Sequence, residues 1–200
     1  MLRTLMICGI LANLTVPMAQ AAETDGIAFS AEVIRTRGDK RTQTRGKLHV
    51  SPEGIRGETT RNGTPVIMIH NTARKTVWMV QPAKKSYTER TGVEQKRPAL
   101  PDETGSPCRM DKNVLCRQVG TEQIEGRRVV HWEIAQRGPD NREIPQAHLW
   151  VDPRLKMAIR ERYADGMQVE LTSIQEGPQP AELFVVPVDF QKITPEAPQP

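Results

Sequence analysis

The sequence predicts an all-β protein built from antiparallel strands, with few short helices. Apolar and polar side chains alternate in four successive runs within residues 128–175, and short turns separate the runs. Similar runs precede them, which gives about ten or eleven strands along the chain. Sustained helical periodicity is almost absent. This spacing is typical of a single barrel or sandwich domain.

The runs within residues 128–175 predict a meander of four strands. Turn residues stand at 138–141, 152–154 and 165–166, and Asp152 followed by Pro153 is typical of turn chemistry. Because the turns are short, consecutive strands have to pair, and we expect one twisted sheet with one strongly apolar face. The side chains expected to share a face are Val130 with Trp132 and Ile134, Leu155 with Met157 and Ile159, and Met167 with Val169 and Leu171.

The N-terminal half predicts a second series of strands. We expect them over residues 27–33, 42–50, 55–60, 65–70 and 77–80, with a further strand through Tyr87. Residues 66–69 and 77–80 are apolar on both faces, and residues 149–151 nearly so, although helices that could cover a second face are scarce. These strands either form the middle of a well-packed sandwich or face a cavity, a ligand or a partner.

The ends of the chain and one internal segment differ from the strand-rich part. Residues 1–21 have the basic, apolar and small-residue regions of a signal peptide cleaved after Ala21, which predicts an exported, periplasmic domain over residues 22–193. Residues 90–113 predict a long loop of the kind that forms lids or binding loops. Residues 194–200 are rich in proline and predict a disordered tail.

Cleavage of the signal peptide leaves Cys108 and Cys116 as an even pair in an oxidising compartment. The pair predicts a structural disulfide, which stabilises by roughly 2–3 kcal/mol in the chain-entropy model for such a short loop. The spacing differs from the Cys-x-x-Cys of redox pairs, and further ligands at zinc spacing are absent from the sequence.

The net charge of +4 is small and no recognition motif accompanies it, so we expect no nucleic-acid partner. A band of basic side chains within residues 35–61 either meets an anionic partner or lipid headgroup, or is a solvated face of edge strands. The band consists of Arg35, Arg37, Lys40, Arg41, Arg45, Lys47, Arg56 and Arg61.

Catalytic motifs are absent from the sequence, and we expect neither an enzyme nor a cofactor. The histidines are scattered singly, which favours structural or surface roles: they are His49, His70, His131 and His148. Soft-metal binding is a third hypothesis, because thioether and imidazole groups are ligands for such metals. It would use Met68, Met79, Met157, His70 and His148, although methionine at strand spacing is usually core packing.

Several stretches carry a resemblance to a known family. They are residues 29–33 (Phe-Ser-Ala-Glu-Val), 149–153 (Leu-Trp-Val-Asp-Pro) followed by 155–162, and 167–174 with a closing 182–187 (Glu-Leu-Phe-Val-Val-Pro). Together they resemble the LolA/LolB-like periplasmic lipoprotein-carrier superfamily. The resemblance implies a single antiparallel, strongly curved sheet that forms an unclosed β-barrel. Its concave apolar face would hold the acyl chains of lipoproteins or other hydrophobic ligands beneath a lid of loops and short helices.

Two main functions follow from these observations. The first is a periplasmic carrier or chaperone that binds an apolar lipid or acyl ligand in the half-barrel cavity, with peripheral contact to the membrane. The second is a non-enzymatic envelope module that binds a protein partner without a ligand. Under the first hypothesis we expect the cavity to be lined by Met68, Trp78, Val80, Trp132, Trp150 and Met157.

Overall fold

The computed structural model describes residues 27–37, 42–93, 106–108 and 113–194, and these residues form one twelve-stranded sheet. The strands are β1 (Phe29–Thr36), β2 (Gln43–Ser51), β3 (Gly54–Arg61), β4 (Thr64–Asn71), β5 (Thr76–Gln81), β6 (Ser86–Thr91), β7 (Val114–Ile124), β8 (Arg127–Arg137), β9 (Glu143–Asp152), β10 (Met157–Tyr163), β11 (Gln168–Glu176) and β12 (Gln191–Lys192). The short 3₁₀ helices η1 (Pro82–Lys84) and η2 (Ala181–Phe184) complete the described elements. The all-β fold class is confirmed.

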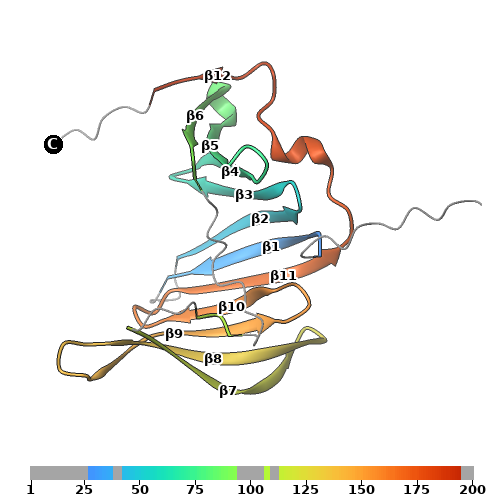
Figure 1. The fold of residues 1–200 in the computed structure, drawn as a ribbon. Coiled ribbons are helices and arrows are strands. Elements are labelled where there is room, and N and C mark those ends of the chain that lie inside the picture. Colours follow the sequence, from blue (N-terminus) through green and yellow to red (C-terminus); the bar gives the residue numbers. More distant parts are fainter. Residues whose placement is uncertain (1–26, 38–41, 94–105, 109–112, 195–200) are drawn as a thin grey trace, which may run out of the picture.

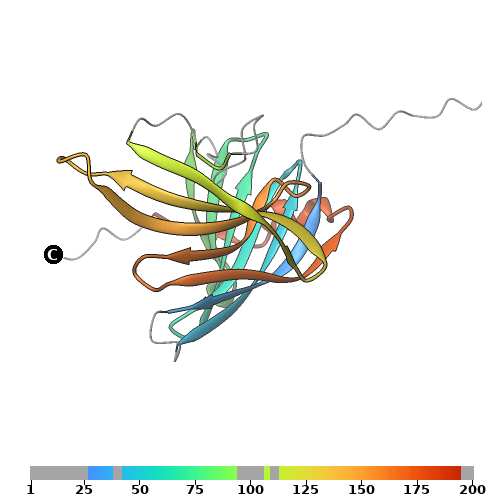
Figure 2. The same ribbon diagram turned by 90° about the horizontal axis from the view of Figure 1, so that it is seen from below.

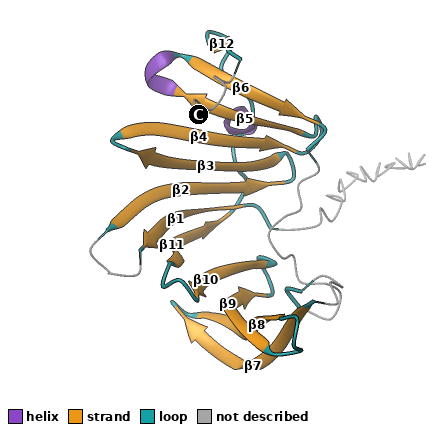
Figure 3. Ribbon diagram, turned by 90° about the vertical axis from the view of Figure 1, so that its left-hand side faces the viewer, coloured by secondary structure: helices purple, strands orange, loops and turns teal. Residues whose placement is uncertain are grey.

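The order of strands across the sheet is β12-β6-β5-β4-β3-β2-β1-β11-β10-β9-β8-β7. Neighbouring strands are antiparallel except β12 and β6, which run parallel. The edge strands β12 and β7 are not neighbours, so the described sheet is curved but unclosed (Figures 1 and 3). Figure 2 shows the strong twist between β7 and β8 and the strands behind them. The unclosed, curved sheet is therefore confirmed.

The predicted meander corresponds to strands β8 to β11, which are successive neighbours in the sheet. Trp132 lies opposite Leu149, and the register runs without a shift from Val130 to Ile134, so the predicted shared face of this strand is confirmed. Trp132 is buried. Strand β7 and the two-residue strand β12 have no alternating pattern that delimits them in advance.

Leu155, Met157 and Ile159 pack in or against one apolar cluster, but the expectation that they alternate along one regular strand is wrong. Strand β10 begins only at Met157, and a register shift between Ala158 and Arg160 interrupts the alternation. Leu155 lies in the preceding turn, where its backbone N–H donates to Asp152 Oδ1 at 3.1 Å. The Asp152 carboxylate thus caps the turn, which confirms the turn chemistry read from the sequence.

The chain after β11 crosses one face of the sheet to reach the opposite edge (Figure 1). We call residues 177–193 the strap. Side chains of β2, β3 and β4 help fix it to the sheet through hydrogen bonds: His49 Nδ1 with Gln179 Oε1 at 2.9 Å, Arg56 Nη1 to the Leu183 carbonyl at 3.2 Å, and Asn71 Nδ2 to the Phe184 carbonyl at 3.1 Å. Its end forms β12 and pairs with β6.

The buried apolar side chains form two clusters. The larger one lies at the central strands and the adjoining hairpins, and it contains Phe29, Ala31, Val33, Val50, Ile55, Ile124, Val129, Trp150, Leu155, Ile159 and Leu171. The smaller cluster is built from Ile69, Trp78, Val80 and Phe184. Phe184 is fully buried, so the strap supplies an essential part of the second core.

Cys108 and Cys116 form a disulfide with their Cα atoms 6.0 Å apart, which confirms the predicted pairing. The expected signal peptide, most of the expected 90–113 loop, and the tail after residue 194 lie outside the described residues.

Candidate binding face on the sheet

The alternation of side chains divides the apolar residues of β4 and β5 between two faces. Met68 lies opposite Met79, whereas the next residues along the two strands, Ile69 and Trp78, lie opposite each other on the other face. Directly opposed residues of antiparallel strands share a face. The two methionines therefore point away from the cluster that Phe184 completes.

The face that carries the methionines has no strap over it. We call it the methionine face and define it by Leu48, Val66, Met68, Val77 and Met79. Met68 is 44% exposed and Met79 is 41% exposed, while the other three are partly buried. Exposed apolar patches of this kind mark binding sites in soluble proteins, and methionine adapts its shape to varied apolar partners.

A glycine leaves open space within the methionine face. The register places Leu48 opposite Gly57, Gly57 opposite Met68, and Met68 opposite Met79, so these residues form one row across β2 to β5. A Cβ added at Gly57 would have no heavy atom within 4 Å. The row therefore offers an apolar surface with room above its centre.

The residues expected to line one cavity lie in different places. Met68 is on the methionine face, and the cross-strand register puts Trp132 on the same side of the sheet. Trp78 and Val80 are buried on the opposite side against the strap. Trp150 and Met157 also lie apart from Met68. Trp150 lies opposite His131, and Met157 is partly buried against the larger cluster. Their role in ligand binding stays a prediction.

The structure joins two histidines that the sequence analysis treats as isolated. His131 Nε2 and His148 Nδ1 are 3.0 Å apart, and the His131 ring stacks on Trp150 with centroids 4.3 Å apart. The reading of these two as single histidines is wrong, because the 138–141 turn brings β8 and β9 side by side. Pairing the two predicted strands across that turn would have revealed the contact.

The soft-metal hypothesis stays a prediction: Met68 and Met79 lie opposite each other on β4 and β5. His70 lies on the same side of the sheet as Met68, two residues along β4, whereas His148 lies on the opposite side. In the described part of the chain, His, Cys, Asp and Glu side chains form no group of three or more that could hold a metal ion.

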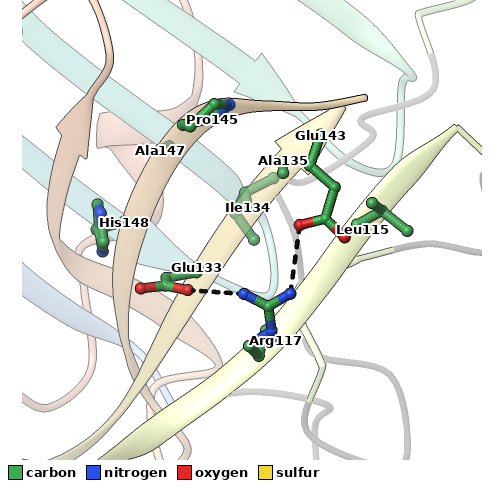
Figure 4. A pocket seen from close by; sticks show the side chains of 9 residues that line it. All are labelled: Leu115, Arg117, Glu133, Ile134, Ala135, Glu143, Pro145, Ala147 and His148. Carbon is green, nitrogen blue, oxygen red and sulfur yellow. Dashed lines mark hydrogen bonds and ion pairs between the residues drawn. The ribbon is translucent and has the colours of Figure 1, made fainter. Parts of the chain in front are cut away.

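A pocket of about 190 Å³ opens beside the histidine pair, between β7, β8 and β9 (Figure 4). Arg117 lies at its centre, 3.4 Å from Glu133 and 3.3 Å from Glu143. His148 also lines this pocket, and none of the residues predicted to line a cavity does.

No family model matches the chain, and no curated protein is similar to it in sequence. None of the helices in the described ranges has the length and apolar content that a membrane crossing needs.

Several solved structures are similar to this chain. An uncharacterized conserved protein from Thermus thermophilus is 13% identical, with 85% of this chain and 91% of that one covered and a TM-score of 0.55. MucB in complex with MucA(peri) is also 13% identical and covers 84% of this chain and 57% of MucB, with a TM-score of 0.49.

A LolA superfamily protein from Nitrosomonas europaea is a further match, 10% identical over 80% of this chain and 91% of that one, with a TM-score of 0.36. At these identities the likeness concerns the fold alone.

Proposed function

We propose that this protein is an exported, non-enzymatic carrier that holds an apolar ligand, an acyl chain, against the methionine face. The observation that carries the proposal is the exposure of Met68 and Met79, 44% and 41%, in a row with Leu48 and Gly57. A ligand that covered them would remove apolar surface from water at roughly 25 cal/mol per Å².

The arrangement of the sheet supports this choice of face. The strap already occupies the other side of β3 to β6, where Phe184 packs against Ile69, Trp78 and Val80. Only the methionine side of these strands leaves large apolar side chains exposed. We retain Met68 and Trp132 as proposed ligand contacts, while Trp78 and Val80 would support β5 from behind.

A fluorescent fatty acid provides the direct test. We expect saturable binding to the full chain and displacement by lipid extract. Gly57→Phe should abolish binding, because the new ring would fill the open space between Leu48 and Met68. Met68→Glu should also weaken binding, because a carboxylate would be placed against the acyl chain.

Matched controls lie on the edge strand β7. A Cβ at Gly120 also meets no heavy atom within 4 Å, so Gly120→Phe introduces the same ring away from the methionine face. Val119→Glu adds a carboxylate at an apolar residue that is 51% exposed. Both controls should bind the fatty acid normally. A folded protein without saturable binding of any acyl probe would defeat the carrier proposal and favour a protein partner on the same face.

A further inference from the structure

The side of the sheet opposite the methionine face carries a continuous row of polar side chains. The register aligns directly opposed residues across seven strands, from β7 to β2. In order they are Arg117, Glu133, His148, Arg162, Gln168, Thr36 and Gln43. Two pockets of similar size open along this row, one of about 190 Å³ at the β7 end and one of about 200 Å³ at the β2 end.

The two pockets differ in charge. In the first, Arg117 is shared by two carboxylates, so one cation and two anions give a formal charge of 1 − 2 = −1 with His148 neutral. The second pocket is lined by Ile34, Thr36, Gln43, Arg160, Arg162, Gln168, Val169 and Glu170. Two arginines and one glutamate give it a formal charge of 2 − 1 = +1.

The arginines of the second pocket have different partners. Arg160 donates to Glu170 Oε1 from Nε at 2.9 Å and from Nη2 at 2.5 Å, so this pair neutralises itself. Arg162 is exposed and forms no ion pair with the described residues. Its guanidinium carbon lies 5.2 Å from the centroid of the Trp150 ring, which positions the cation without neutralising it.

The ring beneath Arg162 is itself held in place. Trp150 is buried, and His131 stacks on it with an interplanar angle of 11°. The guanidinium therefore rests on a fixed surface, which lowers the conformational entropy that ligand binding would cost.

We propose that this second pocket binds a phosphate group, with Arg162 as its cationic contact. Gln43 and Gln168 offer amide N–H donors and Thr36 offers a hydroxyl, so donors from three neighbouring strands line the pocket on one side of the arginine. Such an arrangement suits the several oxygens of a tetrahedral anion, and arginine forms strong charge-assisted hydrogen bonds with phosphate. Because the pocket lies on the side of the sheet opposite the methionine face, the site is independent of acyl binding.

The first experiment is a titration of the full-length mature chain with inorganic phosphate at low ionic strength, monitored by calorimetry and by NMR of backbone amides. We expect shifts at Thr36, Gln43 and Gln168. Arg162→Gln should weaken binding roughly tenfold or more, because it removes a hydrogen-bonded charge. Arg162→Lys should retain part of the affinity.

Arg117→Gln is the matched control, because it removes an arginine from a pocket of similar volume on the same side of the sheet. It should leave phosphate affinity unchanged. Equal losses in Arg117→Gln and Arg162→Gln would overturn the proposal, as would shifts that avoid the pocket. Since Arg117 and Arg162 are both exposed, both variants should keep the thermal unfolding midpoint of the parent, which separates loss of binding from loss of fold.

Vesicles of phosphatidylglycerol distinguish the two sources of phosphate. Vesicle binding that Arg162→Gln removes would support a lipid headgroup as the ligand. Phosphate binding without vesicle binding would support a soluble phosphate ester. If neither probe depends on Arg162, the pocket is not a phosphate site. Arg162→Gln should bind the fluorescent fatty acid as tightly as the parent protein does. A failure of the phosphate proposal is therefore distinguishable from a failure of the carrier proposal.

Discussion

Strands β4 and β5 carry apolar side chains on both faces, and the two faces have different surroundings. On one face Ile69 and Trp78 are buried beneath the strap, and on the other Met68 and Met79 stay exposed. An apolar strand without alternation therefore does not by itself indicate a cavity. Among the described residues, the C-terminal segment covers one face of these two strands, and the other face keeps Met68 and Met79 exposed.

The strap can cover the sheet because its sequence suits that role. Prolines at 178, 180 and 187 favour extended backbone and lack the N–H that a ladder needs. Between them, Leu183 and Phe184 provide the apolar side chains that pack on the sheet. Carbonyl groups of the same two residues accept hydrogen bonds from Arg56 and Asn71, so the backbone of the strap is satisfied where it is buried.

Because the two faces differ, truncation of the adjacent residues Trp78 and Met79 should lower the free energy of unfolding by very different amounts. Trp78→Ala should lower the free energy of unfolding by about 3–5 kcal/mol, because it leaves a void beneath Phe184 and removes the indole hydrogen bond to Glu89. Met79→Ala should cost less, about 1 kcal/mol, because Met79 is already 41% exposed and lies outside the cluster that Phe184 completes. Urea unfolding of both variants measures the difference. Similar losses at the two positions would show that the strap does not cover one face selectively.

The hydrogen bonds of the strap should contribute less than its apolar packing. Asn71 is buried, and its Nδ2 donates to the Phe184 carbonyl, so Asn71→Ala should cost about 1–3 kcal/mol. Gln179→Ala, at the partly buried contact with His49, should cost about 1 kcal/mol or less. Urea unfolding gives both values, and hydrogen exchange of β12 reports whether the strap has loosened. An unchanged exchange rate in Asn71→Ala would contradict this role.

Local patterns predicted much of the strand content and the meander, because alternation and turn residues are properties of neighbouring positions. The strap was not predicted as a cover, since residues 182–187 lie far along the chain from the β4 and β5 strands on which they pack. The register shift in β10 also escaped prediction, because the Asp152 cap and not the alternation sets where that strand begins. The proposed phosphate pocket escaped prediction because Gln43 comes near Gln168 and Arg162 only through the pairing of β1 with β11, which are far apart in the sequence.

The base of the strap is held by an ionic network at the end of β11. Arg127 contacts both Asp152 and Glu176, at 2.5 and 2.6 Å, and Arg154 lies 2.7 Å from Glu176. Asp152 is almost fully buried, whereas Glu176 and Arg127 retain about a fifth of their side-chain exposure. Because the strap starts at the next residue, this network fixes the direction in which it leaves the sheet.

The hydrogen bond from Arg127 is the main reason that the pKa of Glu176 lies below its usual value of 4.5. A carboxylate whose pKa is lowered by folding contributes stability above the unfolded pKa and loses it as the pH falls through the folded pKa. Glu176→Gln should therefore lower the free energy of unfolding by about 1 kcal/mol at pH 7. This gap in unfolding free energy between parent and variant should shrink as the pH falls below 4.5. Urea unfolding at a series of pH values measures this gap, with Glu125→Gln in the exposed β7–β8 turn as the control. A gap that stays constant or widens toward acid would show that Glu176 does not secure the base of the strap through its charge.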